Sequence, residues 1–147
     1  MARIGLLEDN TRIAHLCATM LHYAGHEVTI YTHPSHCLHA LLPETAVHPN
    51  VHSLYSPVNS ILPVEVLILD LSLPEIPGIE VMRRLQSDPQ TQTLPLIVCT
   101  AASASAVADA LTLVPRAGFV EKPFKIQTLT SAIIEVLELV TKNDEKY

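Results

Sequence analysis

Short continuous apolar runs alternate along the chain with longer segments whose apolar residues recur every three or four positions. Runs of this length are typical of strands buried on both faces of a parallel sheet, and the periodic segments are typical of helices that cover it. The runs predict strands at 3–7, 27–31, 64–70, 94–100 and 118–121, and the periodic segments predict helices between 10 and 25 and at about 34–42, 79–88, 101–114 and 125–142. This alternation predicts an α/β fold, a doubly wound parallel sheet with right-handed crossovers.

The first predicted helix carries a signal at each end. Asn10 belongs to the residue types that cap helix N-termini, and Gly25 fits the position just past a helix end. Between them, apolar side chains at helical spacing predict the face that packs on the sheet: Ile13, Leu16, Cys17, Met20 and Leu21.

Polar residues stand at the predicted carboxyl ends of four strands. Glu8 and Asp9 follow the first run, Asp70 closes the third, Thr100 closes the fourth, and Lys122 follows the fifth. Ligands of open α/β sheets bind at the carboxyl ends of the strands. If the runs are neighbouring parallel strands, three carboxylates, a hydroxyl and an ammonium therefore converge at one edge of the sheet.

Three carboxylates at one edge repel one another unless a cation lies among them. Two like charges about 4 Å apart repel by about 4 kcal/mol at an effective dielectric constant of 20. Carboxylates without histidine or cysteine neighbours favour a hard ion such as Mg²⁺, which takes one or two carboxylates, waters and a phosphate oxygen. Lys122 and Thr100 could then contact a phosphoryl group, and Asp70 is the candidate nucleophile.

Composition and charge exclude several other classes of protein. The 147 residues are 48% hydrophobic and 16% charged, which argues against disorder, and a net charge of −6 without a basic stripe disfavours nucleic-acid binding. No apolar run approaches the length of a membrane span and no signal peptide is recognisable, so we expect a cytoplasmic protein without membrane contact. Cys17, Cys37 and Cys99 fall in apolar segments without CxxC spacing, and we expect buried, reduced thiols.

The residues at the strand ends resemble those of the receiver domains of two-component response regulators. The resemblance rests on Glu8-Asp9, on Asp70 within Leu69-Asp70-Leu71-Ser72-Leu73-Pro74 with Gly78 following, on Thr100-Ala101 and on Lys122-Pro123-Phe124. Thr100 and Lys122 also follow Asp70 by 30 and 52 residues, spacings similar to those of the single-domain chemotaxis regulators. The resemblance covers nearly the whole chain.

This resemblance implies a fold and a role for each matching residue. The implied fold is the flavodoxin-like five-stranded parallel sheet in the order 2-1-3-4-5, with five helices. Asp70 would be the phosphoacceptor, and Asp9 and Asp70 would hold Mg²⁺ together with the backbone carbonyl of Ser72 and, through water, Glu8. Thr100 would be the switch hydroxyl, Lys122 its partner at the phosphoryl group, and Phe119 the rotating aromatic switch residue. Without the surrounding motif, Phe119 would be an ordinary core aromatic.

The implied function is that of a stand-alone response regulator receiver. It would take a phosphoryl group from a sensor histidine kinase or a histidine phosphotransfer protein and signal to a downstream effector protein, without turnover as an enzyme. The fourth helix, fifth strand and fifth helix would form the readout surface. Two alternatives stay open: a docking module that works without phosphorylation, and an Asp-nucleophile phosphatase. The phosphatase would need an acidic residue two positions after Asp70, where this chain has Ser72.

The segment before the third strand departs from the family pattern. We expect residues 1–147 to form one receiver domain with a Pro-rich insertion at about 43–63. The insertion is either a tolerated surface loop or a partner contact through Val51, Leu54, Tyr55 and Val58.

Two smaller features also depart from the pattern. His33, His36, Cys37 and His39 crowd the start of the second helix, where a Zn²⁺ or Ni²⁺ site is a weaker hypothesis. Pro77 precedes Gly78 at a position where the family often carries a polar residue, which leaves the geometry of that loop open.

Overall fold

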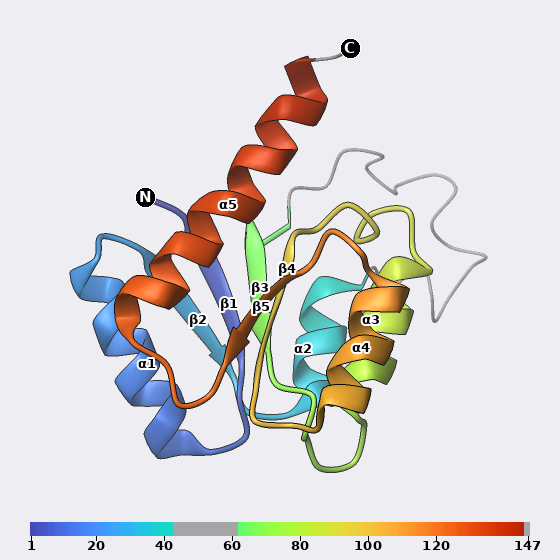
Figure 1. Cartoon of the computed structure of the whole chain (residues 1–147), viewed down its shortest axis with the longest axis horizontal. Helices are drawn as coiled ribbons and strands as arrows, with labels where there is room; N and C mark the ends of the chain where they lie inside the picture. Colours follow the sequence, from blue (N-terminus) through green and yellow to red (C-terminus); the bar gives the residue numbers. More distant parts are fainter. Residues whose placement is uncertain (43–61, 146–147) are drawn as a thin grey trace.

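Five parallel strands form one sheet in the order β2-β1-β3-β4-β5 (Figure 1). The structure, a computed structural model, describes residues 1–42 and 62–145, with side chains described as far as residue 140. The strands are β1 (Arg3–Leu7), β2 (Glu27–Tyr31), β3 (Val66–Leu69), β4 (Leu96–Thr100) and β5 (Gly118–Glu121). The helices are α1 (Thr11–Tyr23), α2 (Pro34–Leu41), α3 (Gly78–Gln86), α4 (Ala104–Leu113) and α5 (Ile126–Glu145). The flavodoxin-like fold expected from the sequence is confirmed.

Helices cover both faces of the sheet. In Figure 1, α1 and α5 lie on one side and α2, α3 and α4 on the other. Successive strand residues point to opposite faces, so each strand contributes to two apolar clusters. Leu67 and Leu69 of β3 belong to the cluster under α2–α4, while Val66 and Ile68 belong to the cluster under α1 and α5. Each fully buried side chain of this kind contributes about 1.5–3 kcal/mol to folding.

The two central strands β3 and β4 are buried at every position, as the continuous apolar runs predict. Both strands begin two residues later than expected. In β4 the reason is Pro95, which has no N–H to donate to a neighbouring strand, although its carbonyl accepts from the N–H of Leu67 at 3.0 Å. Strand β3 also ends one residue earlier than expected, so Asp70 lies just past its last residue and donates its N–H to the Leu7 carbonyl at 3.3 Å.

The end signals of α1 act as predicted. The Asn10 side chain accepts hydrogen bonds from the N–H groups of Arg12 and Ile13, both at 3.1 Å, which caps the helix. Gly25 follows the helix with φ = 97°, a conformation that L side chains rarely adopt.

The predicted buried face of α1 is partly wrong. Cys17 and Leu21 are buried together with Ala14, but Leu16 is 62% exposed and Ile13 is 39% exposed. The buried residues stand three and four positions apart, and at about 100° per residue Ile13 falls on the flank of that face and Leu16 lies well beyond it. The helix thus carries more apolar surface than the sheet can cover.

Three helix boundaries differ from the sequence predictions by two or three residues. Helix α4 begins at Ala104 because the Ser103 side chain caps it, accepting from the Ala106 N–H at 3.2 Å. Residues 101–103 therefore form a loop. Helix α5 extends to Glu145, beyond the expected end at 142, and α3 ends at Gln86. The insertion expected at about 43–63 falls almost entirely on residues 43–61, which lie outside the described residues.

The first testable consequence concerns the helix cap. Asn10→Ala should lower the free energy of unfolding by about 1 kcal/mol because two N–H groups at the start of α1 lose their acceptor. Urea unfolding followed by circular dichroism measures this loss. Asn10→Ser is the matched control, since serine can still cap, and an equal loss in both variants would contradict the cap assignment.

Candidate functional site

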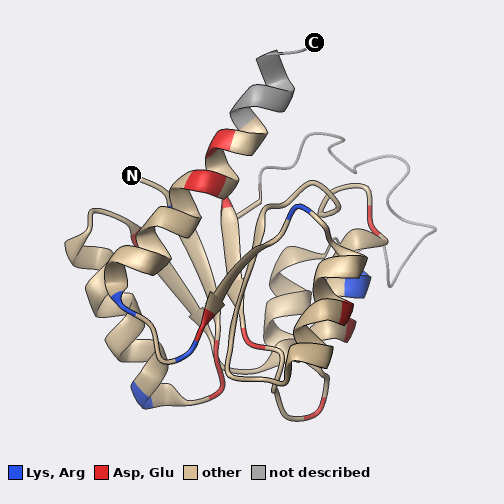
Figure 2. Ribbon diagram, viewed as in Figure 1, with Lys and Arg blue, Asp and Glu red and all other residues tan. Residues whose placement is uncertain are grey.

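The polar residues at the carboxyl ends of the strands lie together at that edge of the sheet. Figure 2 shows charged residues of both signs on the loops at this end of the molecule. Glu8 follows β1, Asp70 follows β3, Thr100 ends β4 and Lys122 follows β5. These four residues lie close together because the carboxyl ends of parallel strands share one edge of the sheet.

The Asp70 carboxylate is held by three hydrogen-bond donors. Its Oδ1 atom accepts from the Thr100 hydroxyl at 2.6 Å and from the Ser72 backbone N–H at 3.0 Å, and its Oδ2 atom accepts from Lys122 Nζ at 2.9 Å. Asp70 is 9% exposed and Thr100 is 1% exposed. The Thr100 Oγ1 atom also accepts from the Ala102 N–H at 3.1 Å, so this hydroxyl is fixed from both sides.

Lys122 joins two carboxylates that are far apart in the sequence. Its Nζ atom forms ion pairs with Asp70 and with Oε1 of Glu8, and all three side chains are largely buried. The other Glu8 oxygen accepts from the Asn10 N–H at 3.2 Å. The backbone N–H of Lys122 donates to the Thr100 carbonyl at 3.0 Å, which anchors the loop after β5 beside β4.

The hydrogen bonds at this site favour the charged forms of both partners. Burial alone would raise the pKa of the Asp70 carboxyl, but the donors from Thr100, Lys122 and Ser72 outweigh burial and hold that pKa below its usual value. Burial alone would lower the pKa of Lys122, but its hydrogen bonds to Glu8 and Asp70 raise it above its usual value. At neutral pH the site therefore holds an ionised aspartate next to a protonated lysine.

Two of the residues named from the sequence, Asp9 and Phe119, stand apart from this cluster, and a third, Ser72, joins it only through its backbone. Asp9 is exposed, Ser72 contributes its backbone N–H while its side chain is exposed, and Phe119 lies on β5 with 41% of its surface exposed. Phe119 is therefore not a core aromatic. Among the side chains that the structure describes, no three from His, Cys, Asp or Glu lie close enough together to hold a metal ion.

The described side chains also decide the hypotheses about histidines and thiols. The rings of His33 and His36 contact edge to face with their centres 5.0 Å apart, but Cys37 points into the core and is fully buried. The start of α2 therefore does not assemble the Zn²⁺ site considered from the sequence. Cys17 and Cys99 are likewise free and buried, as expected, and burial raises the pKa of Cys17 to about 11 and that of Cys99 to about 12.

An apolar cleft that the sequence pattern did not predict opens beside Lys122. Its volume is about 350 Å³, and its apolar lining is Ile13, Leu16, Met20, Ala101, Pro123 and Phe124. The exposed flank of α1 forms one wall and the loop after β5 forms the other. The sequence feature that indicates this cleft is the number of apolar residues on α1, which is more than one face of a helix can bury.

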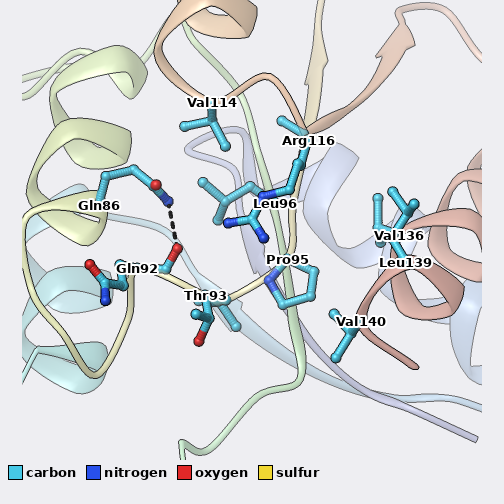
Figure 3. Close-up of a pocket in the computed structure, with 12 residues that line it drawn as sticks. Gln86, Gln92, Thr93, Pro95, Leu96, Val114, Arg116, Val136, Leu139 and Val140 are labelled. Atoms are coloured by element: carbon cyan, nitrogen blue, oxygen red, sulfur yellow. Dashed lines mark hydrogen bonds between the residues drawn. The ribbon is translucent and has the colours of Figure 1, made fainter. Parts of the chain in front are cut away.

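A second cavity lies at the opposite end of the sheet. It is about 30 Å³, enough for little more than a water molecule, and is lined by residues around the start of β4 and the second half of α5 (Figure 3). At its edge Gln86 donates to the Gln92 carbonyl at 3.3 Å. This cavity is remote from the four clustered residues and does not belong to their site.

The family comparison agrees with this geometry. The family model of the response regulator receiver domain matches residues 4–134, a span that includes all four clustered residues. Among the described residues, no helix is both long and apolar enough to cross a membrane.

Solved structures with this fold cover nearly the whole chain at low sequence identity. A CheY-like response regulator receiver domain protein from Methanospirillum hungatei JF-1 is 21% identical, with a TM-score of 0.74 over 97% of this chain and 98% of that chain. The chemotaxis protein CheY4 of Vibrio cholerae is 20% identical, with a TM-score of 0.69 over 92% of this chain and 98% of that chain. At this identity the structures establish the fold alone.

The chain also resembles part of a curated protein. The chemotaxis protein CheV1 of Helicobacter pylori is 27% identical over 85 residues, which make up 56% of this chain and 26% of CheV1. The match thus spans about a quarter of that relative's length.

The ion pairs predict a loss of stability that depends on pH. Lys122→Met should lower the free energy of unfolding at pH 7 by about 3 kcal/mol, because Glu8 and Asp70 then lose their shared buried countercharge. The depressed pKa of Asp70 stabilises the fold above the unfolded pKa of about 3.9, and this contribution is lost as the pH falls through the folded pKa. The difference between variant and wild type should therefore shrink below about pH 4.

Urea unfolding at several pH values measures both effects. Lys125→Met is the matched control, since Lys125 is exposed and its replacement should change the free energy by less than about 0.5 kcal/mol. A loss that is equal at neutral and acidic pH would contradict the electrostatic assignment.

Proposed function

This chain belongs to the response regulator receiver domain family, and we propose that within two-component signalling Asp70 accepts a phosphoryl group from a histidine kinase or a histidine phosphotransfer protein. The phosphorylated chain then signals through contact with a downstream effector protein. It is a phosphoryl-accepting module and not a turnover enzyme. We further propose that residues 1–147 are one receiver domain.

The observation that carries the proposal is the set of donors around Asp70. Thr100, Ser72 and Lys122 keep the carboxylate ionised, which is the state that a nucleophile requires. In the transfer, an Asp70 oxygen forms a bond to phosphorus while the bond from phosphorus to the donor's imidazole nitrogen breaks. The electron pair of that bond stays on the imidazole nitrogen, and the imidazole leaves as a neutral group because its other ring nitrogen carries a proton. Lys122 and Thr100 are within reach to donate to the transferred oxygens.

The oxygen donors at the site fit Mg²⁺ in kind. Asp9, Asp70 and the backbone carbonyl of Ser72 would hold the ion, with Glu8 acting through water, and Mg²⁺ typically needs only one or two carboxylates besides water and phosphate oxygens. With one ammonium facing the Glu8 and Asp70 carboxylates and Asp9 following directly, the cluster has an excess of negative charge. When bound, Mg²⁺ supplies positive charge that offsets the negative oxygens of the phosphoryl group.

Phosphorylation would change the contacts of Thr100 and Lys122. A phosphoryl group adds about −1.5 to −2 charge and strong acceptors, which compete for the Thr100 hydroxyl now donated to Asp70. Thr100 and Phe119 lie on the adjacent strands β4 and β5, and the Phe119 ring is exposed rather than packed in the core. Coupling of this kind between two sites typically amounts to about 1–3 kcal/mol. Phosphorylation of Asp70 would therefore shift an existing conformational equilibrium of the surface formed by α4, β5 and α5.

The apolar cleft beside Lys122 favours a protein as phosphoryl donor. Lys122 lines both the cleft and the Asp70 site, so a helix seated against Leu16 and Phe124 would bring a donor histidine to the same rim. Docking without phosphorylation would use the cleft too, but it gives no reason for a buried carboxylate with three donors. A phosphatase is disfavoured because Ser72 stands where its acid would be needed.

Phosphorylation itself is the direct test. Incubation with Mg²⁺ and acetyl phosphate should add one phosphoryl group per chain by intact mass, and Asp70→Asn or a chelator should abolish the gain. Asp109→Asn, an exposed aspartate on α4, is the matched control and should be phosphorylated like wild type. A gain that persists in Asp70→Asn, or none in wild type, would contradict the proposal, and continuous release of phosphate from diverse phosphomonoesters would favour the phosphatase.

The switch has a separate test. Beryllofluoride, which mimics a phosphoryl group on aspartate, should shift the Phe119 amide resonance in wild type and in Thr100→Ser, because both carry a hydroxyl at position 100. Thr100→Val should lose most of this shift while retaining the shift of the Asp70 amide. Equal Phe119 shifts in all three proteins would exclude the hydroxyl as the coupling group.

A further inference from the structure

Gly78 lies against the backbone of the candidate phosphoacceptor. A Cβ atom at this position would stand 2.2 Å from the Asp70 carbonyl oxygen, 2.6 Å from the Leu71 Cα and 3.0 Å from the Asp70 carbonyl carbon. The Gly78 N–H also donates to the Leu71 carbonyl at 3.0 Å. All these neighbours are backbone atoms, so no side chain can rotate away to make room.

The loop between β3 and α3 is held by its backbone. Helix α3 starts at Gly78 without a side-chain cap, since Pro77 occupies the cap position with φ = −59°. Within the loop, Glu75 has φ = 66°, and the Ile76 N–H donates to the Pro74 carbonyl at 2.7 Å. Proline fixes φ near this value in any context. Pro77 therefore restricts how far Gly78 can move relative to the Asp70 backbone.

We propose that Gly78 is a positioning residue for Asp70. Its bare Cα lets the first turn of α3 lie directly on the Asp70 and Leu71 backbone, and this contact fixes the Asp70 carboxylate relative to Thr100, Lys122 and the Ser72 N–H. The inference rests on the proposed function and adds to it a residue that touches none of the reacting atoms.

The size of the effect follows from the contact distances. Real Cβ atoms essentially never approach a heavy atom closer than 3.0 Å, so the 2.2 Å contact requires the two backbones to separate by most of an ångström. A displacement of about 1 Å at a reacting group can reduce a rate by about 100-fold. Gly78→Ala should therefore slow phosphorylation by acetyl phosphate by about 100-fold, measured by intact mass under conditions where the variant is folded.

Gly25→Ala is the matched control. Gly25 has φ = 97° and nothing within 4 Å of its missing side chain, so alanine there strains the backbone without touching the site. Its urea midpoint should fall, but its phosphorylation rate should stay within about twofold of wild type. Equal rates in the two variants would overturn the positioning role and leave Gly78 as a packing residue only.

A second readout separates this inference from the proposed function. The Ser72 N–H donates to Asp70 Oδ1, and its amide resonance and hydrogen-exchange rate report that contact without metal or phosphate. Gly78→Ala should shift the Ser72 resonance and speed its exchange, whereas Gly25→Ala should change neither. If wild type cannot be phosphorylated, the proposed function fails and the Ser72 amide alone decides the positioning role.

A second pair of variants covers the case in which Gly78→Ala does not fold. Pro77→Gly adds no atoms and removes only the φ restriction that limits the position of Gly78. Pro89→Gly makes the same change in the turn after α3, away from the site. Pro77→Gly should slow phosphorylation several-fold and speed exchange of the Ser72 amide relative to Pro89→Gly. Identical behaviour of the two proline variants would overturn the inference.

Discussion

The Lys122 ammonium lies between the carboxylates of Glu8 and Asp70, and all three side chains are largely buried. Each of these charges alone would be costly to bury, because a buried ion that lacks a partner loses its hydration without compensation. The three are tolerated because every one of them is hydrogen-bonded, Glu8 by the Asn10 N–H as well, and Asp70 by Thr100 and Ser72. This constraint ties the loops after β1, β3 and β5 to one another. This arrangement lets an ionised carboxylate stand at the edge of an apolar core.

Much of the fold and of the site could be predicted from the sequence, because both depend on where apolar runs begin and end. The runs at β3 and β4 are unbroken, and a strand buried on both faces requires that pattern. Asp70 and Thr100 stand where those runs end, and parallel topology then brings them together. The geometry agrees with that expectation for Glu8, Asp70, Thr100 and Lys122, while the roles of these residues in phosphoryl transfer stay a proposal.

The features that could not be predicted depend on distances rather than on pattern. Helical spacing grouped Ile13 and Leu16 with the buried residues of α1, but it does not tell how wide a face the sheet can cover, and the surplus became a wall of the apolar cleft. The loop at 101–103 arises because Ser103 captures the start of α4. The closeness of Gly78 to the Asp70 backbone is likewise invisible in a sequence. Relatives of 20–21% identity keep the fold over more than nine-tenths of the chain, as expected if pattern, and not residue identity, specifies it.

The ion pair between Glu8 and Lys122 joins residues 114 positions apart. Contacts of such separation close a long loop, and the entropy lost in closing it opposes their formation. Lys122 follows β5, which is an edge strand and the last strand in the chain. The cluster of Glu8, Asp70 and Lys122 is therefore completed only when β5 joins the sheet. A partly folded chain, or one whose edge strand has opened, has an Asp70 without its ammonium, so this ionic cluster exists only in the fully assembled sheet.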